Sequence, residues 1–229
     1  LNSKSQKWGR KLALTCVKVM LAAVVGIGIC GVAAGIGAFR GILSSTPTIR
    51  LSDVVAVGEA TIVYDKEGNE IDQYVSTNSN RLSVGMDEIP DYMGKAFVAI
   101  EDERFYQHNG IDVKGILRAG YQFLKTGGEE AQGASTITQQ LLKNTVFTDW
   151  TSEGSNKIKK IKRKIQEQYL ALEITKYYSK AEILLRYMNA INLGQNTLGV
   201  ESASLRYFGK HCSDLTVSEC AVIASITQN

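Results

Sequence analysis

An uncharged, largely apolar run at residues 19–39 (VMLAAVVGIGICGVAAGIGAF) limits the architecture of this chain before any other motif is considered. As a helix rising about 1.5 Å per residue, the run spans roughly 30 Å, the thickness of a bilayer core. The basic residues that precede it are Lys4, Lys7, Arg10, Lys11 and Lys18, and no acidic residue occurs before Asp53. Because basic residues favour the cytoplasmic side, we expect a single-pass anchor with a cytoplasmic N-terminus and everything after Arg40 outside.

A cleavable signal peptide is the alternative interpretation of this run. Small residues near Gly35 and Gly37 could serve a signal peptidase. The apolar core is, however, long for a signal sequence. We therefore expect an uncleaved transmembrane helix.

The rest of the chain divides by composition into a linker and a helical domain. Two β-favouring runs within residues 60–75 flank a turn that contains Gly68 and Asn69, which predicts a β-hairpin. The expected organisation is a basic tail at 1–18, an anchor at 19–39, a juxtamembrane linker with the hairpin at 40–79, and a domain at 80–229. We expect this domain to continue beyond Asn229.

Composition excludes several classes of function. The formal net charge of +3 is too small to indicate nucleic-acid binding, so no nucleic acid is expected as a partner. With 2 prolines and 21 glycines, the sequence favours helices separated by glycine-containing turns. The four cysteines form no CxxC motif, which argues against a zinc site. Cys212 and Cys220 could form a disulfide or remain free thiols.

The segment 96–110 (AFVAIEDERFYQHNG) holds the first candidate for chemistry. Read as one helix, it places Phe97, Glu101, Phe105 and His108 on one side. A carboxylate flanked by aromatic rings loses hydration and takes up a proton more readily, as a general base must. An amphipathic helix whose Glu pairs with a cation is the alternative.

The segment 133–144 (GASTITQQLLKN) predicts a capped helix start. Ser135 and Thr136 suit the N-cap, and Gln139 lies at capping-box distance from Thr136. Gln139, Gln140 and Lys143 then project polar groups beside free backbone N–H groups, which suit an anion. The alternative is an ordinary capped helix with solvated glutamines.

The segment 156–176 is the second strong helix prediction and carries two different faces. One is an apolar stripe of Ile158, Ile161, Ile165 and Leu172. The other gathers Lys160, Arg163, Lys164 and Glu167, which are spaced as neighbours on a helix. A basic patch around one carboxylate suits phosphate or anionic lipid, and a solvated charged face is the alternative.

The remaining segments, 179–194, 199–210 and 215–228, look structural. In the first we expect Ile183, Leu184 and Tyr187 in the core. Arg186 and Asn189 lie one turn apart and could orient other side chains. Thr216 or Ser218 should cap the final helix.

Taken together and in order, five blocks resemble the peptidoglycan glycosyltransferases found in class A penicillin-binding proteins and in monofunctional transglycosylases. The blocks are Glu101-Asp102 with Phe105, His108 and Gly110; 133–140; Arg163-Lys164 with Glu167; Lys180 through Tyr187, Asn189 and Gly194; and Gly199 through Lys210, continuing to Leu215-Thr216 and Glu219. The resemblance covers roughly residue 80 to the end. Leu193, where an aromatic residue is common, and a somewhat long 145–157 loop depart from the pattern without removing a catalytic residue.

The resemblance implies roles for particular residues. Glu101 matches the general base that takes a proton from the acceptor's 4-hydroxyl. Glu167 matches the second Glu, which acts near the donor pyrophosphate, with a divalent cation (Mg or Mn) as a candidate helper and no organic cofactor. Substrate-binding roles fall on Asp102, Phe105, His108, Ser135, Thr138, Gln139, Gln140, Lys143, Arg163, Lys164 and Asn189. No residue is assigned as a metal ligand.

The resemblance also implies a mainly α, lysozyme-like domain outside a bacterial cell membrane. Its substrates would be lipid II, a disaccharide-peptide on undecaprenyl pyrophosphate, and the growing glycan strand. Turning an α-linked donor into a β-1,4 glycan requires inversion, hence a base on one side and charge stabilisation of the leaving group on the other. The lipid bilayer and cell-wall elongation or division proteins are the expected partners.

Several alternatives stay open. The hairpin favours a bifunctional protein with a transpeptidase domain downstream over a monofunctional transglycosylase. A muramidase-like hydrolase would also use a Glu in a helical cleft, but it needs no basic patch. A non-catalytic glycan-binding scaffold of the same fold would not need both Glu101 and Glu167. A basic membrane-surface binder explains only residues 156–164.

Overall fold

The computed structural model describes residues 2–55, 58–75, 80–126, 133–148, 154 and 156–228. Parts of the loops expected between the helices, at 127–132 and 149–153, lie outside the described residues. The chain forms two compact units, Leu1–Pro47 and Thr48–Asn229.

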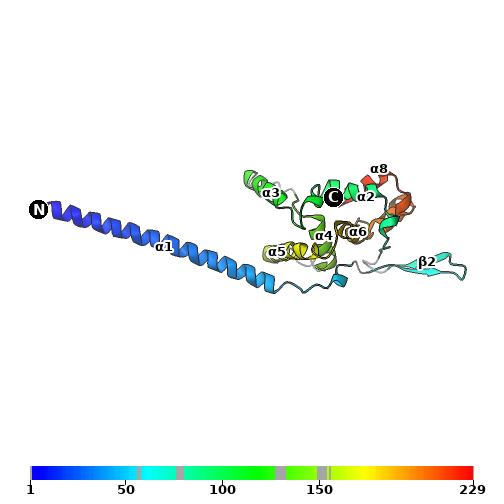
Figure 1. Ribbon diagram of the computed structural model, residues 1–229, viewed down its shortest axis with the longest axis horizontal. Coiled ribbons are helices and arrows are strands. Elements are labelled where there is room, and N and C mark those ends of the chain that lie inside the picture. The colour runs from blue at the N-terminus through cyan, green and yellow to red at the C-terminus, as the bar shows by residue number, and fades with distance from the viewer. Residues whose placement is uncertain are drawn as a thin grey trace. The chain divides into compact units, whose positions relative to one another are not determined.

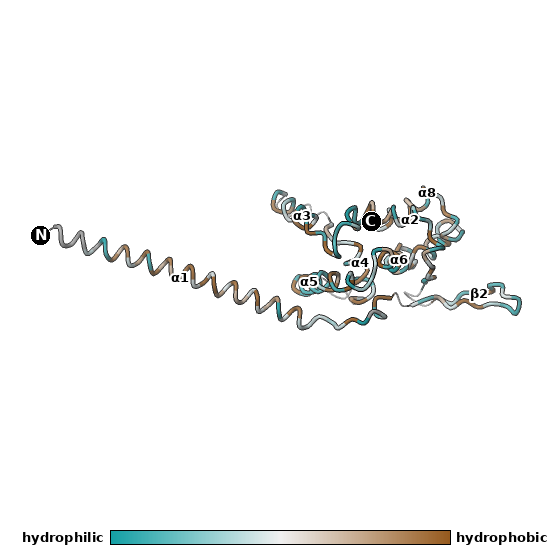
Figure 2. The backbone as a smooth tube through the Cα atoms, in the orientation of Figure 1, coloured by the Kyte–Doolittle hydropathy of each residue, from teal (hydrophilic) through white to brown (hydrophobic). Residues whose placement is uncertain are grey.

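The first unit is dominated by the helix α1, Asn2–Ser44, which extends well beyond the predicted anchor at both ends. Its segment Arg10–Ser44 contains an 18-residue window with a mean hydropathy of 2.5, and none of this window is buried within the protein. Figure 2 shows apolar residues along most of α1. Among the described residues, α1 is the one helix long and apolar enough to cross a membrane. A helix satisfies its backbone hydrogen bonds internally, which suits a lipid surrounding.

The strands of the second unit form a short hairpin of β1, Thr61–Tyr64, and β2, Glu70–Tyr74. The strands are antiparallel, and Thr61 pairs with Tyr74. The Asp65 carboxylate accepts hydrogen bonds from the backbone N–H groups of Glu67 (2.9 Å) and Asn69 (2.8 Å). Gly68 takes a φ of +87°, which glycine adopts readily. The hairpin and its turn were predicted at these residues, and the structure confirms both (Figure 1).

The remaining elements of this unit are helices. They are α2 (Asp91–Glu101), α3 (Val113–Lys125), α4 (Ile137–Thr145), α5 (Lys157–Ile174), α6 (Lys180–Ala190), α7 (Val200–Phe208) and α8 (Val217–Ser225). Short 3₁₀ helices lie at Leu51–Asp53, Met86–Glu88, Phe105–Gln107, Cys212–Asp214 and Ile226–Gln228. Helix α4 packs against α5 and α6, and α2 packs against α6 and α8.

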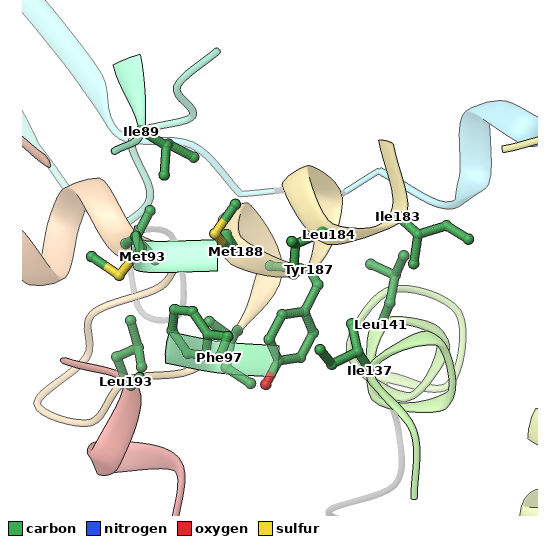
Figure 3. Packing of buried hydrophobic residues seen from close by; sticks show 14 of the residues in the cluster. Ile89, Met93, Phe97, Ile137, Leu141, Ile183, Leu184, Tyr187, Met188 and Leu193 are labelled. Carbon is green, nitrogen blue, oxygen red and sulfur yellow. The ribbon is translucent and has the colours of Figure 1, made fainter. Parts of the chain in front are cut away.

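One hydrophobic core joins α2, α4, α5, α6, α7 and α8, and α3 contributes no residue to it. The rings of Phe97 in α2 and Tyr187 in α6 meet edge to face, with centroids 5.6 Å apart. Figure 3 shows these rings side by side, with Ile137 and Leu141 of α4 next to Tyr187. The expected core positions in α6 are therefore confirmed, and the core fixes α4 beside the end of α2.

Helix starts follow the capping chemistry of the sequence. Thr136, Ser179 and Thr216 are the N-caps of α4, α6 and α8, each within a capping box. In α4 the Thr136 hydroxyl accepts the Gln139 N–H, and the Gln139 amide oxygen accepts the Thr136 N–H. The predicted cap of 133–144 is confirmed, and Thr216 rather than Ser218 caps the final helix.

The expected single helix over 96–110 is wrong, because α2 ends at Glu101. Asp102 leaves the helical region with φ −158°, and its carboxylate accepts the Ile137 N–H at 3.1 Å. The same carboxylate lies 2.9 Å from His108 Nε2. A hydrogen bond to the start of α4 therefore ends the helix, although the apolar periodicity continues to Phe105.

Helix α5 buries a different face from the apolar stripe. Ile158 is 80% exposed and Ile161 58%, whereas Leu170, Ala171 and Glu167 are buried. A Cβ at Gly110, where φ is +87°, would lie 2.3 Å from the Ala171 carbonyl oxygen. The turn at residue 110 thus rests directly on the buried face of α5, and only glycine fits there.

Candidate active site

An open cleft of about 540 Å³ lies between the end of α2, the start of α4 and α5. Six of the residues predicted for the site line it: Glu101, Asp102, Ser135, Gln140, Lys143 and Lys164. Residues from sequence segments more than 60 positions apart thus meet around one hollow. The cleft therefore combines carboxylates, Glu101 among them, with lysine and arginine side chains.

Glu101 is the last residue of α2 and is held at both carboxylate oxygens. The Gln140 side-chain amide donates to Oε2 at 2.6 Å, and the Thr227 hydroxyl hydrogen-bonds Oε1. Tyr187 in turn donates its hydroxyl to the Gln140 amide oxygen at 3.2 Å. Burial raises the pKa of Tyr187, so the phenol stays protonated and remains a donor. The Gln140 amide nitrogen is therefore oriented toward Glu101.

The cationic side of the cleft is held by one buried carboxylate. Glu167 has no solvent exposure and forms ion pairs with Arg163 and, at 2.9 Å, with Lys164. Lys164 Nζ also donates to the Ser135 hydroxyl at 2.9 Å. The side chain of Lys164 is 43% exposed and reaches the cleft, whereas that of Arg163 is 11% exposed. Glu167 therefore orients cations and does not itself face the cleft.

The remaining predicted residues do not line this cleft: Phe105, His108, Thr138, Gln139, Arg163, Glu167 and Asn189. Phe105 is a core ring beneath the Lys180 ammonium, 4.3 Å from the ring centroid, and His108 contacts Asp102. Thr138 and Gln139 are buried in the first turn of α4. Phe105, Thr138 and Gln139 are thus packed inside the domain and do not open onto the cleft.

The sequence predicts Asn189 as a substrate-binding residue, but its side chain hydrogen-bonds the backbone of Val84 instead. Its side chain accepts the Val84 N–H at 3.0 Å and donates to the Val84 carbonyl at 2.9 Å. Its own carbonyl accepts a hydrogen bond from Arg81 Nε at 2.9 Å. Asn189 thus anchors the segment that leads into α2, in line with the expectation that it could orient other groups.

Sequence reasoning missed other residues that line the cleft. Arg104 Nη2 lies 2.5 Å from Asp112 Oδ2, and Arg118 lies in the same wall. The hydrogen bond between Arg104 and Asp112 raises the pKa of Arg104 and lowers the pKa of Asp112. Thr227 comes from the last 3₁₀ helix. No local pattern marks these residues, because only the fold brings them to the cleft.

The residues present do not fit a divalent cation at Glu167. This carboxylate is already paired with two cations, and Mg²⁺ or Mn²⁺ needs several free oxygen ligands. Within the described ranges, no cluster of three or more His, Cys, Asp or Glu side chains could hold a metal. The lysine and arginine side chains are the cations that this chain offers to an anion.

A mainly helical domain with carboxylates and cations from several segments around a common cleft is the arrangement expected of a transglycosylase. Residues 67–229 match the family described as Transglycosylase, so the chain belongs to the transglycosylase family, which has a lysozyme-like fold. The resemblance seen in the sequence is thereby confirmed.

The curated relatives are penicillin-binding proteins. Penicillin-binding protein 1A of Clostridium perfringens (strain 13 / Type A) is 44% identical over 190 residues, which are 82% of this chain and 27% of that protein. Penicillin-binding protein 1A of Clostridium botulinum (strain Langeland) is 42% identical over 204 residues, 88% of this chain and 24% of that protein. Penicillin-binding protein 1F of Bacillus subtilis (strain 168) is 40% identical over 164 residues, 72% of this chain and 21% of that protein. The chain thus spans about a quarter of the length of these relatives.

Proposed function

We propose that this chain is a peptidoglycan glycosyltransferase of cell-wall synthesis, which polymerises lipid II into β-1,4-linked glycan and releases undecaprenyl pyrophosphate. The observation that carries the proposal is a single cleft that holds Glu101 between two hydrogen-bond partners and also presents Lys143 and Lys164. Membership of the transglycosylase family supports the reaction class. The names of the relatives favour a penicillin-binding protein over a monofunctional transglycosylase.

In the proposed reaction Glu101 takes the proton of the acceptor's 4-hydroxyl. The acceptor oxygen forms a bond to C1 of the donor sugar while the bond from C1 to the pyrophosphate oxygen breaks. The electron pair of that bond leaves on the pyrophosphate, and attack from the opposite face inverts C1. A base placed to receive the proton contributes about 10²–10⁴-fold in rate.

The lysines act on the leaving group. Lys164 is fixed by Ser135 and Glu167, so its ammonium is oriented before substrate arrives. Lys143 projects from α4 into the same cleft. Two such cations stabilise the negative charge that grows on the pyrophosphate, and Glu167 serves by holding Lys164 and Arg163 in place.

A lipid-linked substrate also explains the N-terminal helix. We infer that α1 anchors the protein in the bacterial cell membrane with its N-terminus in the cytoplasm, since its basic residues precede the apolar run. The glycosyltransferase domain would then lie outside, at the surface where lipid II is presented. Cell-wall elongation or division proteins remain the expected partners.

The test is polymerisation of lipid II by the membrane-anchored protein in detergent, comparing wild type with Glu101→Gln. We expect glycan chains from wild type and a loss of at least about 100-fold on substitution, typical of removing a general base. Glu173→Gln is the matched control, because Glu173 lies near the end of α5 and pairs with the exposed Lys176 just beyond this helix. This control should retain full activity.

Other outcomes would contradict the proposal in distinguishable ways. Release of muropeptides from purified glycan, without polymer from lipid II, would indicate a hydrolase. Binding of lipid II without turnover in a folded protein would indicate a scaffold. Full activity of Glu101→Gln would exclude Glu101 as the base.

A further inference from the structure

We infer that Thr227 is a positioning residue for Glu101, whose hydroxyl hydrogen-bonds this carboxyl group both before and after it takes a proton. The inference rests on the proposed role of Glu101 as the base. Thr227 lies in the 3₁₀ helix Ile226–Gln228, which follows α8, and it is separated from Glu101 by most of the domain sequence. Its hydroxyl reaches the cleft where Glu101 ends α2.

The Thr227 hydroxyl has two acceptors within reach. Its Oγ1 hydrogen-bonds Glu101 Oε1 and lies 2.9 Å from the backbone carbonyl oxygen of Ala224. A hydroxyl carries one proton and can also accept. The proton can therefore point to Glu101 or to Ala224, but not to both at once.

Gln140, which contacts the second oxygen of Glu101, has no such choice. Its amide oxygen accepts the Tyr187 hydroxyl, which leaves the amide nitrogen facing Glu101 Oε2. An amide nitrogen can only donate. Gln140 therefore matches the ionised carboxylate at Oε2, and it cannot accept a proton that Glu101 gains.

The hydrogen-bonding capacities of Thr227 and Gln140 place the new proton on Oε1 of Glu101 and not on Oε2. Before reaction, Glu101 is a carboxylate and the Thr227 proton points to Oε1. When the acceptor O–H bond breaks, its proton forms a new O–H bond at Oε1 of Glu101. The Thr227 proton then rotates toward the Ala224 carbonyl, and its oxygen accepts the new Glu101 O–H. The covalent O–H bond of Thr227 stays intact throughout.

The experiment compares Thr227→Val, which replaces the hydroxyl with a methyl group, and Thr227→Ser, which keeps it. The readouts are kcat and KM for lipid II polymerisation, with the membrane-anchored protein in detergent. A hydrogen bond to a charged group is worth roughly a factor of 10 to 100 in an equilibrium. We expect Thr227→Val to lower kcat by about tenfold or more with little change in KM.

The expected loss falls on kcat because the Thr227 hydroxyl acts on Glu101, which takes part in the chemical step. Thr227→Ser should restore kcat. Ser225→Ala is the control, because the exposed Ser225 hydroxyl donates to the Val222 carbonyl and does not contact Glu101.

A purely structural role would give a different pattern. If Thr227→Val raises KM as much as it lowers kcat, or if Thr227→Ser is impaired equally, the inference is overturned. In a Glu101→Gln background Thr227→Val should cause no further loss, because the two residues act together. Should Glu101→Gln itself polymerise lipid II normally, the proposed function fails first, whereas an inactive Glu101→Gln with a fully active Thr227→Val refutes only this inference.

Discussion

Replacing Glu167 tests whether this residue holds cations in place or takes part in the reaction itself. The Glu167 side chain has no solvent exposure and pairs with Arg163, whose side chain is only 11% exposed. Removing one member of a buried ion pair usually costs about 3–5 kcal/mol, because the remaining charge stays buried without its partner. Lys164 adds less, since its side chain is 43% exposed and also contacts Ser135.

We therefore expect Glu167→Gln to lower the free energy of unfolding by about 3 kcal/mol. Glutamine keeps the size of the side chain, so the loss reports the charge and not a cavity. The assay is guanidinium unfolding of the membrane-anchored protein at constant detergent, followed by circular dichroism. Activity should fall in the same variant, because Lys164 loses the contact that orients it in the cleft.

An ion pair on the surface near the end of α5 provides the control. Glu173 Oε1 and Lys176 Nζ lie 2.6 Å apart, and their side chains are 32% and 60% exposed. Glu173→Gln should therefore leave the unfolding midpoint unchanged. If Glu167→Gln unfolds at the wild-type midpoint and yet loses activity, the structural reasoning is refuted. Glu167 would then have to reach the substrate after a rearrangement of α5.

Two further predictions concern hydrogen bonds around the cleft and on the surface of the domain. Tyr187→Phe should lower the free energy of unfolding in guanidinium by about 1 kcal/mol, because the hydrogen bond to Gln140 is lost. It should also lower lipid II turnover roughly tenfold, because the Gln140 amide is no longer held toward Glu101. Unchanged turnover would show that Gln140 needs no such partner. His211 Nδ1 lies 2.6 Å from Glu201, and this hydrogen bond raises the pKa of His211. Because the folded-state pKa is the higher one, the stabilisation is full below the unfolded value of about 6.5 and is lost as pH rises through the folded value. Wild type should thus exceed His211→Asn in thermal stability at about pH 5.5, and the difference should vanish at about pH 9; a difference independent of pH would contradict this.

Much of the fold could be predicted because its signals are local. The apolar run of α1, the turn at Gly68 and the capping box that begins with Thr136 each depend on residues a few positions apart. Local propensity and spacing decide such features before the chain is packed. The grouping of Glu101, Gln140 and Lys164 in one site was predicted instead from the resemblance of the ordered sequence blocks to a known family.

Other features depended on contacts between distant segments. Periodicity predicted that α2 continues to His108, yet a hydrogen bond from the Ile137 N–H to Asp102 ends it at Glu101. Periodicity also marked the stripe of Ile158 and Ile161 on α5, but packing buried the opposite side. Helical spacing reports which residues share a face and not which face meets the core.

The sequence by itself determined which chemical groups this protein has: an apolar helix, a carboxylate at residue 101, and lysines at 143 and 164. Only the tertiary structure decided what each group touches. In the folded domain Glu167 is buried beside two cations, and the Asn189 side chain hydrogen-bonds the backbone of Val84. Thr227 contacts Glu101 although the two residues are 126 positions apart in the sequence. The physical reason is that covalent order fixes residue identity and local geometry, whereas burial and hydrogen-bond partners depend on how the helices close around one core.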